Sequence, residues 1–158
     1  MNKTSNETYA SAQRFIRLLR DQQSEMPMQQ ADVLLAIARR PGLTMAELAE
    51  EVDLAQSSCS RNVAALSEYH RLGKPGLGLV EAVIDPREPR RRAIFLTQKG
   101  KVFVTQLMRV FNPDFSFDRD TDARVEIERM HREAAAAREA KNKAERDAKR
   151  KPRRSRST

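Results

Sequence analysis

The sequence is poor in the residues that build covalent, metal and catalytic sites. It has 158 residues, with one cysteine and two histidines. Cys59 alone excludes an intramolecular disulfide framework and is typical of a reducing compartment. His70 and His131 have no cysteine or carboxylate at metal-ligand spacing, so we expect no metal site. This composition favours an intracellular protein.

Long apolar runs are also missing. The N-terminal segment MNKTSNETYASAQRF contains no apolar stretch long enough for a signal peptide or a membrane span. No nucleophile–base arrangement or paired acidic site stands out, and KPGLG has too few glycines for a phosphate-binding loop. We therefore expect a cytoplasmic protein that is neither an enzyme nor a membrane protein and that has no cofactor.

Charge is plentiful but unevenly placed. Charged residues make up 33% of the chain and hydrophobic residues 39%, so the core must be modest. Residues 1–120 contain 17 Lys and Arg against 15 Asp and Glu, a net of +2, whereas residues 121–158 contain 13 against 7, a net of +6. A basic excess of this kind predicts a polyanionic partner such as nucleic acid.

Three segments in the first part of the chain have the signals of helices. The first extends from Glu7 to about Gln22, and the second, QQADVLLAIAR, ends before the Pro-Gly pair at 41–42. In the third, Thr44 is a good N-cap, and Glu47 three residues later completes a capping box.

The third segment and the residues after it have the pattern of a helix-turn-helix. Asp53-Leu54 forms a tight turn, and a further helix is predicted from Gln56 to Tyr69. Cys59 falls on its core-facing side, so we predict a buried small hydrophobe rather than a redox switch. Short polar side chains let a helix approach phosphates closely while an arginine reaches a guanine edge. The predicted DNA-binding residues of this helix are Ser57, Ser58, Ser60, Arg61 and Asn62.

A basic hairpin follows. The segments VEAVI and RAIFL are predicted to be short strands on either side of a tip from Asp85 to Arg92. Four arginines on this proline-stiffened tip form a rigid cationic prong suited to a phosphate backbone or a DNA minor groove. The DNA-binding residues predicted in this region are Arg87, Arg90 and Arg91, with Lys74 in the preceding loop. The order of elements predicts a winged helix-turn-helix, a mainly α fold with a small β-hairpin wing (α+β).

From about Gln29 to Leu107 the chain resembles the multiple-antibiotic-resistance regulator (MarR) family of winged-helix transcription factors. LTMAELAEEVDLAQSSCSRNVAAL is similar to the family's helix-turn-helix, and LTQKG at 96–100 to its exit from the wing. The D-x-R-x-x-R wing signature is matched by Asp85, Arg87 and Arg90. The turn departs from the family in having Asp53 where Gly is usual.

The resemblance implies a homodimer, joined through the N-terminal helix and the C-terminal helices, that binds a palindromic operator on double-stranded DNA. The recognition helix would enter the major groove with its serines and Arg61. Arg87 and Arg90 would reach the flanking minor groove, and Asp85 would brace the wing.

The charge pattern also predicts three parts along the chain. Residues 1–112 form the winged helix-turn-helix domain with its N-terminal helix, and residues 113–120 are a connector. Residues 121–158 form a charged tail, with no Gly or Pro before Pro152, that is helical and ends in a disordered basic segment.

Three functions are compatible with this pattern. The first is a sequence-specific transcriptional regulator, a repressor that occupies a promoter. The second is an adaptor or assembly protein that uses the winged helix for protein contacts. The third is a winged helix that serves DNA replication or packaging.

Overall fold

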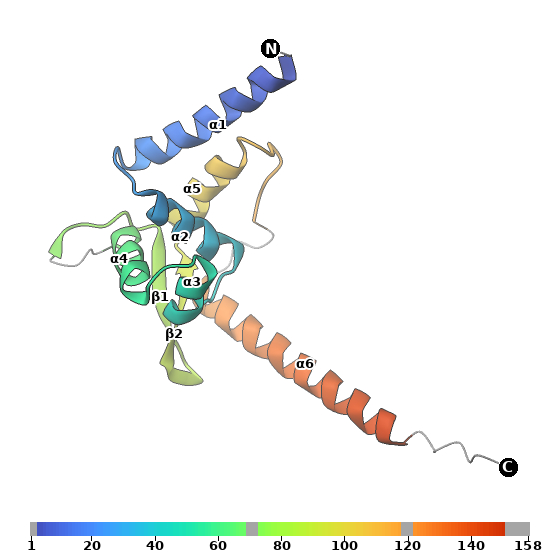
Figure 1. The fold of residues 1–158 in the computed structure, drawn as a ribbon. Coiled ribbons are helices and arrows are strands. Elements are labelled where there is room, and N and C mark those ends of the chain that lie inside the picture. Colours follow the sequence, from blue (N-terminus) through green and yellow to red (C-terminus); the bar gives the residue numbers. More distant parts are fainter. Residues whose placement is uncertain (1–2, 69–72, 118–121, 151–158) are drawn as a thin grey trace. The chain divides into compact units, whose positions relative to one another are not determined.

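The computed structural model describes residues 3–68, 73–117 and 122–150 (Figure 1). Along the chain, its elements are α1 (Lys3–Gln22), α2 (Met28–Arg39), α3 (Met45–Glu51), α4 (Gln56–Leu66), β1 (Val80–Asp85), β2 (Glu88–Leu96), α5 (Gln98–Met108) and α6 (Ala123–Arg150). This order confirms the predicted mainly α fold with one β-hairpin. None of the described helices combines the length and the apolar character that a membrane crossing requires.

The chain divides into two compact units, residues 1–123 and residues 124–158. The first unit contains α1 to α5 and the hairpin around one apolar core. Its fully buried large side chains are Leu34, Ile37, Leu48, Leu66, Leu79, Ile94, Leu107, Val33, Val80 and Val104. They come from four helices, the hairpin and the residue before it, so a modest core is enough to fix all these elements.

Helix α1 lies on the outside of this core, along α5. Leu19 is buried, and the rings of Phe15 and Phe111 lie 5.4 Å apart between centroids. The helix begins at Lys3, four residues before the predicted start at Glu7.

Helix α4 is shorter than predicted because the returning chain satisfies its last carbonyl groups. It ends at Leu66 instead of Tyr69, which lies outside the described residues. The N–H of Leu77 donates to the carbonyl of Ala65 at 3.0 Å, and that of Leu79 donates to Leu66 at 2.7 Å. Helix ends need such partners for their free carbonyl groups. Here the strand-like segment before β1 supplies them.

The hairpin differs from the prediction at its tip. Strands β1 and β2 pair in regular antiparallel register from Val80–Leu96 to Ile84–Arg92, and the next pair is Asp85–Glu88. Three residues of β2, at positions 89–91, therefore have no counterpart in β1 and form a bulge. The turn itself is only Pro86-Arg87. The eight-residue tip was thus a wrong prediction, because the strands continue almost to the turn.

Helix α5 begins against the backbone that precedes the hairpin. The Thr97 hydroxyl caps it by accepting from the N–H of Gly100 at 3.0 Å. A Cβ atom at Gly100 would lie only 1.9 Å from the carbonyl oxygen of Leu79. Only glycine therefore permits this approach of the helix to the chain.

Helix α6 has 28 residues and belongs almost entirely to the second unit. Near its start, Arg129 forms ion pairs with Glu126 and with Glu133, the second at 2.6 Å. These pairs lie within the helix at i,i+3 and i,i+4 spacing and stabilise it locally.

We predict that Gly100→Ala lowers the free energy of unfolding by about 2–3 kcal/mol, because the added methyl group forces backbone atoms apart. Urea unfolding followed by circular dichroism measures this change. Gln106→Ala, at an exposed position of the same helix, should change stability little. Equal stabilities of the two variants would show that the contact is not tight.

Candidate nucleic-acid interface

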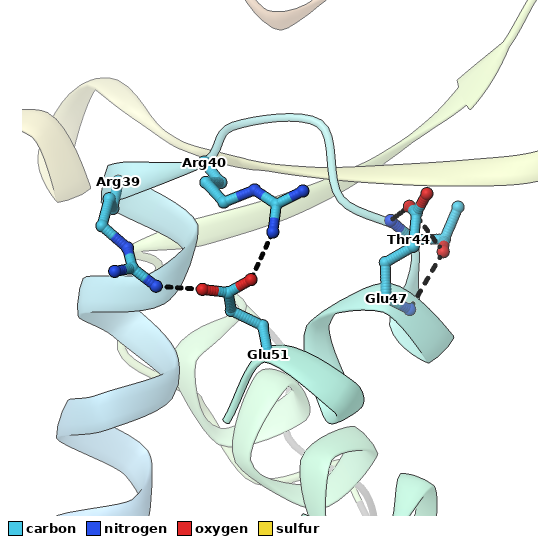
Figure 2. Close-up of polar contacts among 5 residues, drawn as sticks. All are labelled: Arg39, Arg40, Thr44, Glu47 and Glu51. Atoms are coloured by element: carbon cyan, nitrogen blue, oxygen red, sulfur yellow. Dashed lines mark hydrogen bonds and ion pairs between the residues drawn. The ribbon is translucent and has the colours of Figure 1, made fainter. Parts of the chain in front are cut away.

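The first helix of the predicted helix-turn-helix begins with the expected capping box. The backbone N–H of Thr44 donates to the Glu47 carboxylate at 2.7 Å, and the Thr44 hydroxyl accepts from the Glu47 N–H at 3.3 Å (Figure 2). The hydrogen bond from the Thr44 backbone, the strongest influence, and that from its hydroxyl lower the pKa of Glu47. The positive charges of Arg91 and Arg40 act in the same direction.

The other end of α3 is held by ion pairs. Glu51 accepts from both Arg39 and Arg40 at the end of α2 (Figure 2). The Glu51 side chain is 17% exposed, whereas the two arginines are 68% and 57% exposed. The carboxylate thus holds α3 against α2, while both cations remain at the surface. The sequence did not predict this contact, because Arg40 and Arg39 precede Glu51 by 11 and 12 residues and no local pattern joins residues so far apart.

The turn between α3 and α4 explains the departure at Asp53. This residue has φ of +50°, in the left-handed region that normally favours glycine. Asp is among the few other residues that adopt this conformation readily. The N–H of Leu54 then donates to the carbonyl of Ala49 at 2.9 Å and closes the turn. The predicted tight turn is present, and Ala49 is buried beneath it.

Helix α4 separates its residues into a buried side and an outer side. Cys59, Val63 and Leu66 are buried. Cys59 is fully buried, as predicted, and burial raises the pKa of its thiol. A protonated buried thiol is a poor nucleophile, and this residue serves to pack the helix against the core.

The outer side of α4 carries the five polar residues that the sequence predicts as a DNA contact. Ser57 and Arg61 are exposed, whereas Ser58, Ser60 and Asn62 are half-buried. The Arg61 guanidinium donates to the Ser58 hydroxyl at 2.9 Å, and the Asn62 amide donates to the Ser58 carbonyl at 3.0 Å. The structure therefore brings Ser58, Arg61 and Asn62 together, with Ser58 holding the other two.

Asp85 lies at the base of the hairpin turn. It is 2% exposed, and its carboxylate accepts from the backbone N–H of Arg87 at 2.9 Å. A buried carboxylate with such a bond restricts the turn, because breaking the bond would leave the charge without this donor. Sequence and structure agree on the position of this residue in the wing.

The arginines of the hairpin lie in different environments. Arg87, Arg90 and Arg92 are exposed, whereas Arg91 is half-buried and close enough to α3 to lower the pKa of Glu47. Only Arg87 belongs to the turn, and Arg90 and Arg91 lie in the bulge of β2. The expectation of four arginines on one rigid tip is therefore corrected.

One further DNA-binding candidate, Lys74, and the two histidines belong to other segments of the chain. Lys74 is exposed in the loop between α4 and β1. His131 is half-buried on α6, and His70 lies outside the described residues. Among the residues that the structure describes, no cluster of three or more His, Cys, Asp or Glu could hold a metal ion.

Comparison with known proteins agrees with this geometry. The model of the MarR family matches residues 24–68, which contain α2, α3 and the described α4. The fold is similar to that of MepR from S. aureus in a complex with DNA, with 17% identity, a TM-score of 0.51, and coverage of 89% of this chain and 94% of that one. Wild-type apo MarR from E. coli also matches, with 19% identity, a TM-score of 0.47, and coverage of 91% and 98%. No curated protein matches the sequence.

We predict that the capping box gives α3 a stability that depends on pH. The pKa of Glu47 is lower in the folded than in the unfolded state, so its contribution is complete above the ordinary carboxyl pKa and is lost as the pH falls through the folded value. Glu47→Gln should therefore be less stable than the native protein by about 0.3–1 kcal/mol near neutral pH, and this difference should vanish in acid.

Urea unfolding at about pH 7 and about pH 3 measures this difference. Glu50→Gln is the control, since Glu50 is an exposed carboxylate of the same helix outside the capping box. A difference for Glu47→Gln that persists unchanged in acid would contradict the role of its charge.

Proposed function

We propose that this chain, whose winged helix is of the MarR type, is a sequence-specific DNA-binding regulator of transcription that represses by occupying a promoter. The observation that carries the proposal is the outer side of α4. It displays Ser57 and Arg61 on a helix whose opposite side is locked into the core. This helix is followed by a hairpin that exposes Arg87 and Arg90.

Recognition of bases is the role of α4. In the major groove an arginine can donate two hydrogen bonds to the O6 and N7 atoms of guanine. The hydroxyl of Ser58 already holds the guanidinium of Arg61 at one of its nitrogens. This bond reduces the rotamer freedom that Arg61 would otherwise lose on binding. The small side chains of Ser57 and Ser60 allow phosphates to approach, and Asn62 keeps its amide oxygen for a contact.

Contact with the flanking minor groove is the role of the hairpin. A bulge redirects the side chains of a strand, and Arg90 lies in the bulge of β2, close in sequence to the turn that carries Arg87. Asp85 fixes the turn that carries Arg87. Arg91 and Lys74 then supply phosphate contacts at the edges of this surface. A narrow minor groove attracts arginine because of its negative potential.

The proposal includes a homodimer in the cytoplasm. A palindromic operator requires two recognition helices related by two-fold symmetry. Helix α1 offers apolar surface for such a pairing, since Tyr9 is 62% and Ile16 is 53% exposed. The C-terminal helices complete the dimer in this proposal. The MepR structure, which has this fold, is a complex with DNA, and it supports DNA as the partner.

An adaptor that uses the winged helix for protein contacts is the second candidate. The net charge of only +2 over residues 1–120 favours it, because non-specific DNA binding depends on basic surface. Selection of bound DNA from a random pool separates the two candidates. A palindromic consensus supports the regulator and its dimer, whereas the absence of any enriched sequence supports the adaptor.

We predict that Arg61→Ala loses discrimination at one base position of the selected consensus, at a cost of about 1–3 kcal/mol, because one bidentate contact to a base is lost. Binding to the consensus and to its single-base variants measures this loss. Arg109→Ala, which removes a cation at the end of α5, should leave the base preference unchanged. A preference that Arg61→Ala leaves intact would remove Arg61 from the interface.

We predict that Arg87→Ala combined with Arg90→Ala weakens binding to all sequences and makes its salt dependence shallower by about 2, because each cation removed from the DNA surface leaves about one counterion unreleased. Binding isotherms across a series of salt concentrations give the slope. The pair Arg14→Ala and Arg17→Ala removes the same charge from exposed positions of α1. A wing without contact to DNA would show the same slope as this control.

A further inference from the structure

The second half of α6 is a helix without a core. Every side chain from Arg132 to Ala148 is exposed. Such a helix needs its own stabilisation, and the sequence supplies it through frequent alanine, the residue with the highest helix propensity. Glu139 and Glu145 each precede a lysine by four residues, in the favourable orientation for an ion pair. The chain thus maintains a long helix for some purpose other than packing within its own fold.

The charge of α6 changes sharply along its length. Residues 122–137 contain 3 Lys and Arg against 4 Asp and Glu, a net of −1. Residues 138–150, the rest of α6, contain 6 against 3, a net of +3. Residues 151–158, beyond α6, add 4 Lys and Arg and no Asp or Glu, so residues 138–158 contain 10 against 3, a net of +7. Nearly the whole basic excess of the protein, +8, is therefore concentrated in its last 21 residues (138–158).

We propose that residues 138–158, termed the basic arm, bind the phosphate backbone of duplex DNA without regard to sequence. The inference rests on the proposed function, since the duplex is the one that carries the operator. Its described helical part, residues 138–150, rises about 20 Å at 1.5 Å per residue. That length matches the phosphates of about six base pairs. The arm supplies the general attraction to DNA that residues 1–120, with a net charge of +2, provide only weakly.

The composition of the basic arm favours DNA over a membrane surface. A helix that lies in a bilayer interface needs a face of large apolar side chains. Residues 138–150 contain alanine as their only apolar residue, so this helix has nothing to insert among lipid chains. Binding to phosphates requires only exposed cations, and Arg138, Lys141, Lys143 and Arg146 are exposed.

The test is a triple variant, Arg138→Gln, Lys141→Gln and Arg146→Gln. These positions are exposed, and none is the lysine that follows Glu139 or Glu145 by four residues. Glutamine has nearly the same helix propensity as lysine and arginine. Binding of the full-length chain to a labelled random-sequence duplex is measured over a series of salt concentrations. We expect the slope of log K against log salt to become shallower by about 2–3, while the ratio of operator to random-sequence affinity is unchanged.

The matched control is Arg14→Gln, Arg17→Gln and Arg20→Gln, which removes the same charge from exposed positions of α1. Its slope should equal that of the native chain. If the slope of log K against log salt became equally shallow in both variants, the proposal for the basic arm would be overturned, because the loss of net charge alone would then explain the effect. An unchanged slope in the α6 variant, with operator preference intact, would also overturn it but leave the proposed function standing.

A charge-retaining variant separates contact from helix structure. Arg138→Lys, Lys141→Arg and Arg146→Lys should restore the native slope, and failure to do so would count against the arm. A native chain without any operator preference would instead contradict the proposed function. The random-sequence slopes would still decide whether the basic arm binds DNA.

Discussion

The pairing of Ile94 with the loop before α3 fixes the hairpin relative to the helix-turn-helix. The N–H of Gly42 donates to the carbonyl of Ile94 at 2.8 Å, and the N–H of Ile94 donates to the carbonyl of Leu43 at 2.9 Å. Both Leu43 and Ile94 are buried, so water does not compete for these bonds. The loop thereby forms an isolated antiparallel β-bridge with β2, at Leu43 and Ile94. Because α3 begins immediately after this loop, these bonds connect the hairpin directly to the helix-turn-helix.

The two ends of α3 are held by separate contacts. The capping box fixes its first turn, and Glu51 ties its last turn to α2. A helix of 7 residues would be unstable alone. It is held here because the loop, the cap and the ion pairs act on consecutive parts of one segment. The position of α4 then follows from the short turn at Asp53.

The parts of the site that could be predicted from the sequence depend on neighbours in the chain. The capping box joins residues three positions apart, and the buried side of α4 repeats at helical spacing. The bulge of β2 could not be predicted, because alternation alone does not reveal three extra residues in one strand. The end of α4 at Leu66 could not be predicted either. It depends on hydrogen bonds from Leu77 and Leu79, which reach the helix only after the chain has reversed its direction.

The distribution of charge gives the molecule two kinds of basic surface. In residues 1–120 the 17 cations are nearly balanced by 15 acidic residues, and several are held by partners such as Ser58 or Glu51. In residues 138–158 the 10 cations face only 3 acidic residues, and the side chains of α6 from Arg138 to Ala148 are exposed. A small number of oriented cations suits discrimination between sequences, whereas many exposed ones suit general attraction. In our proposal, discrimination belongs to the first compact unit and general attraction to the second.

The segment from Gly76 to Leu79 forms a joint between the end of α4 and the start of α5. A Cβ atom at Gly76 would lie 1.9 Å from the carbonyl of Ser67, and one at Gly100 would lie 1.9 Å from that of Leu79. In both cases the added Cβ would meet a backbone carbonyl oxygen, so no choice of neighbouring side chain can relieve the clash. We therefore expect both glycines to tolerate substitution poorly. The outer residues of α4 and the arginines of the hairpin lie on either side of this joint. In our proposal, these outer residues and arginines are the positions that can change to suit another operator, while the joint keeps the scaffold unchanged.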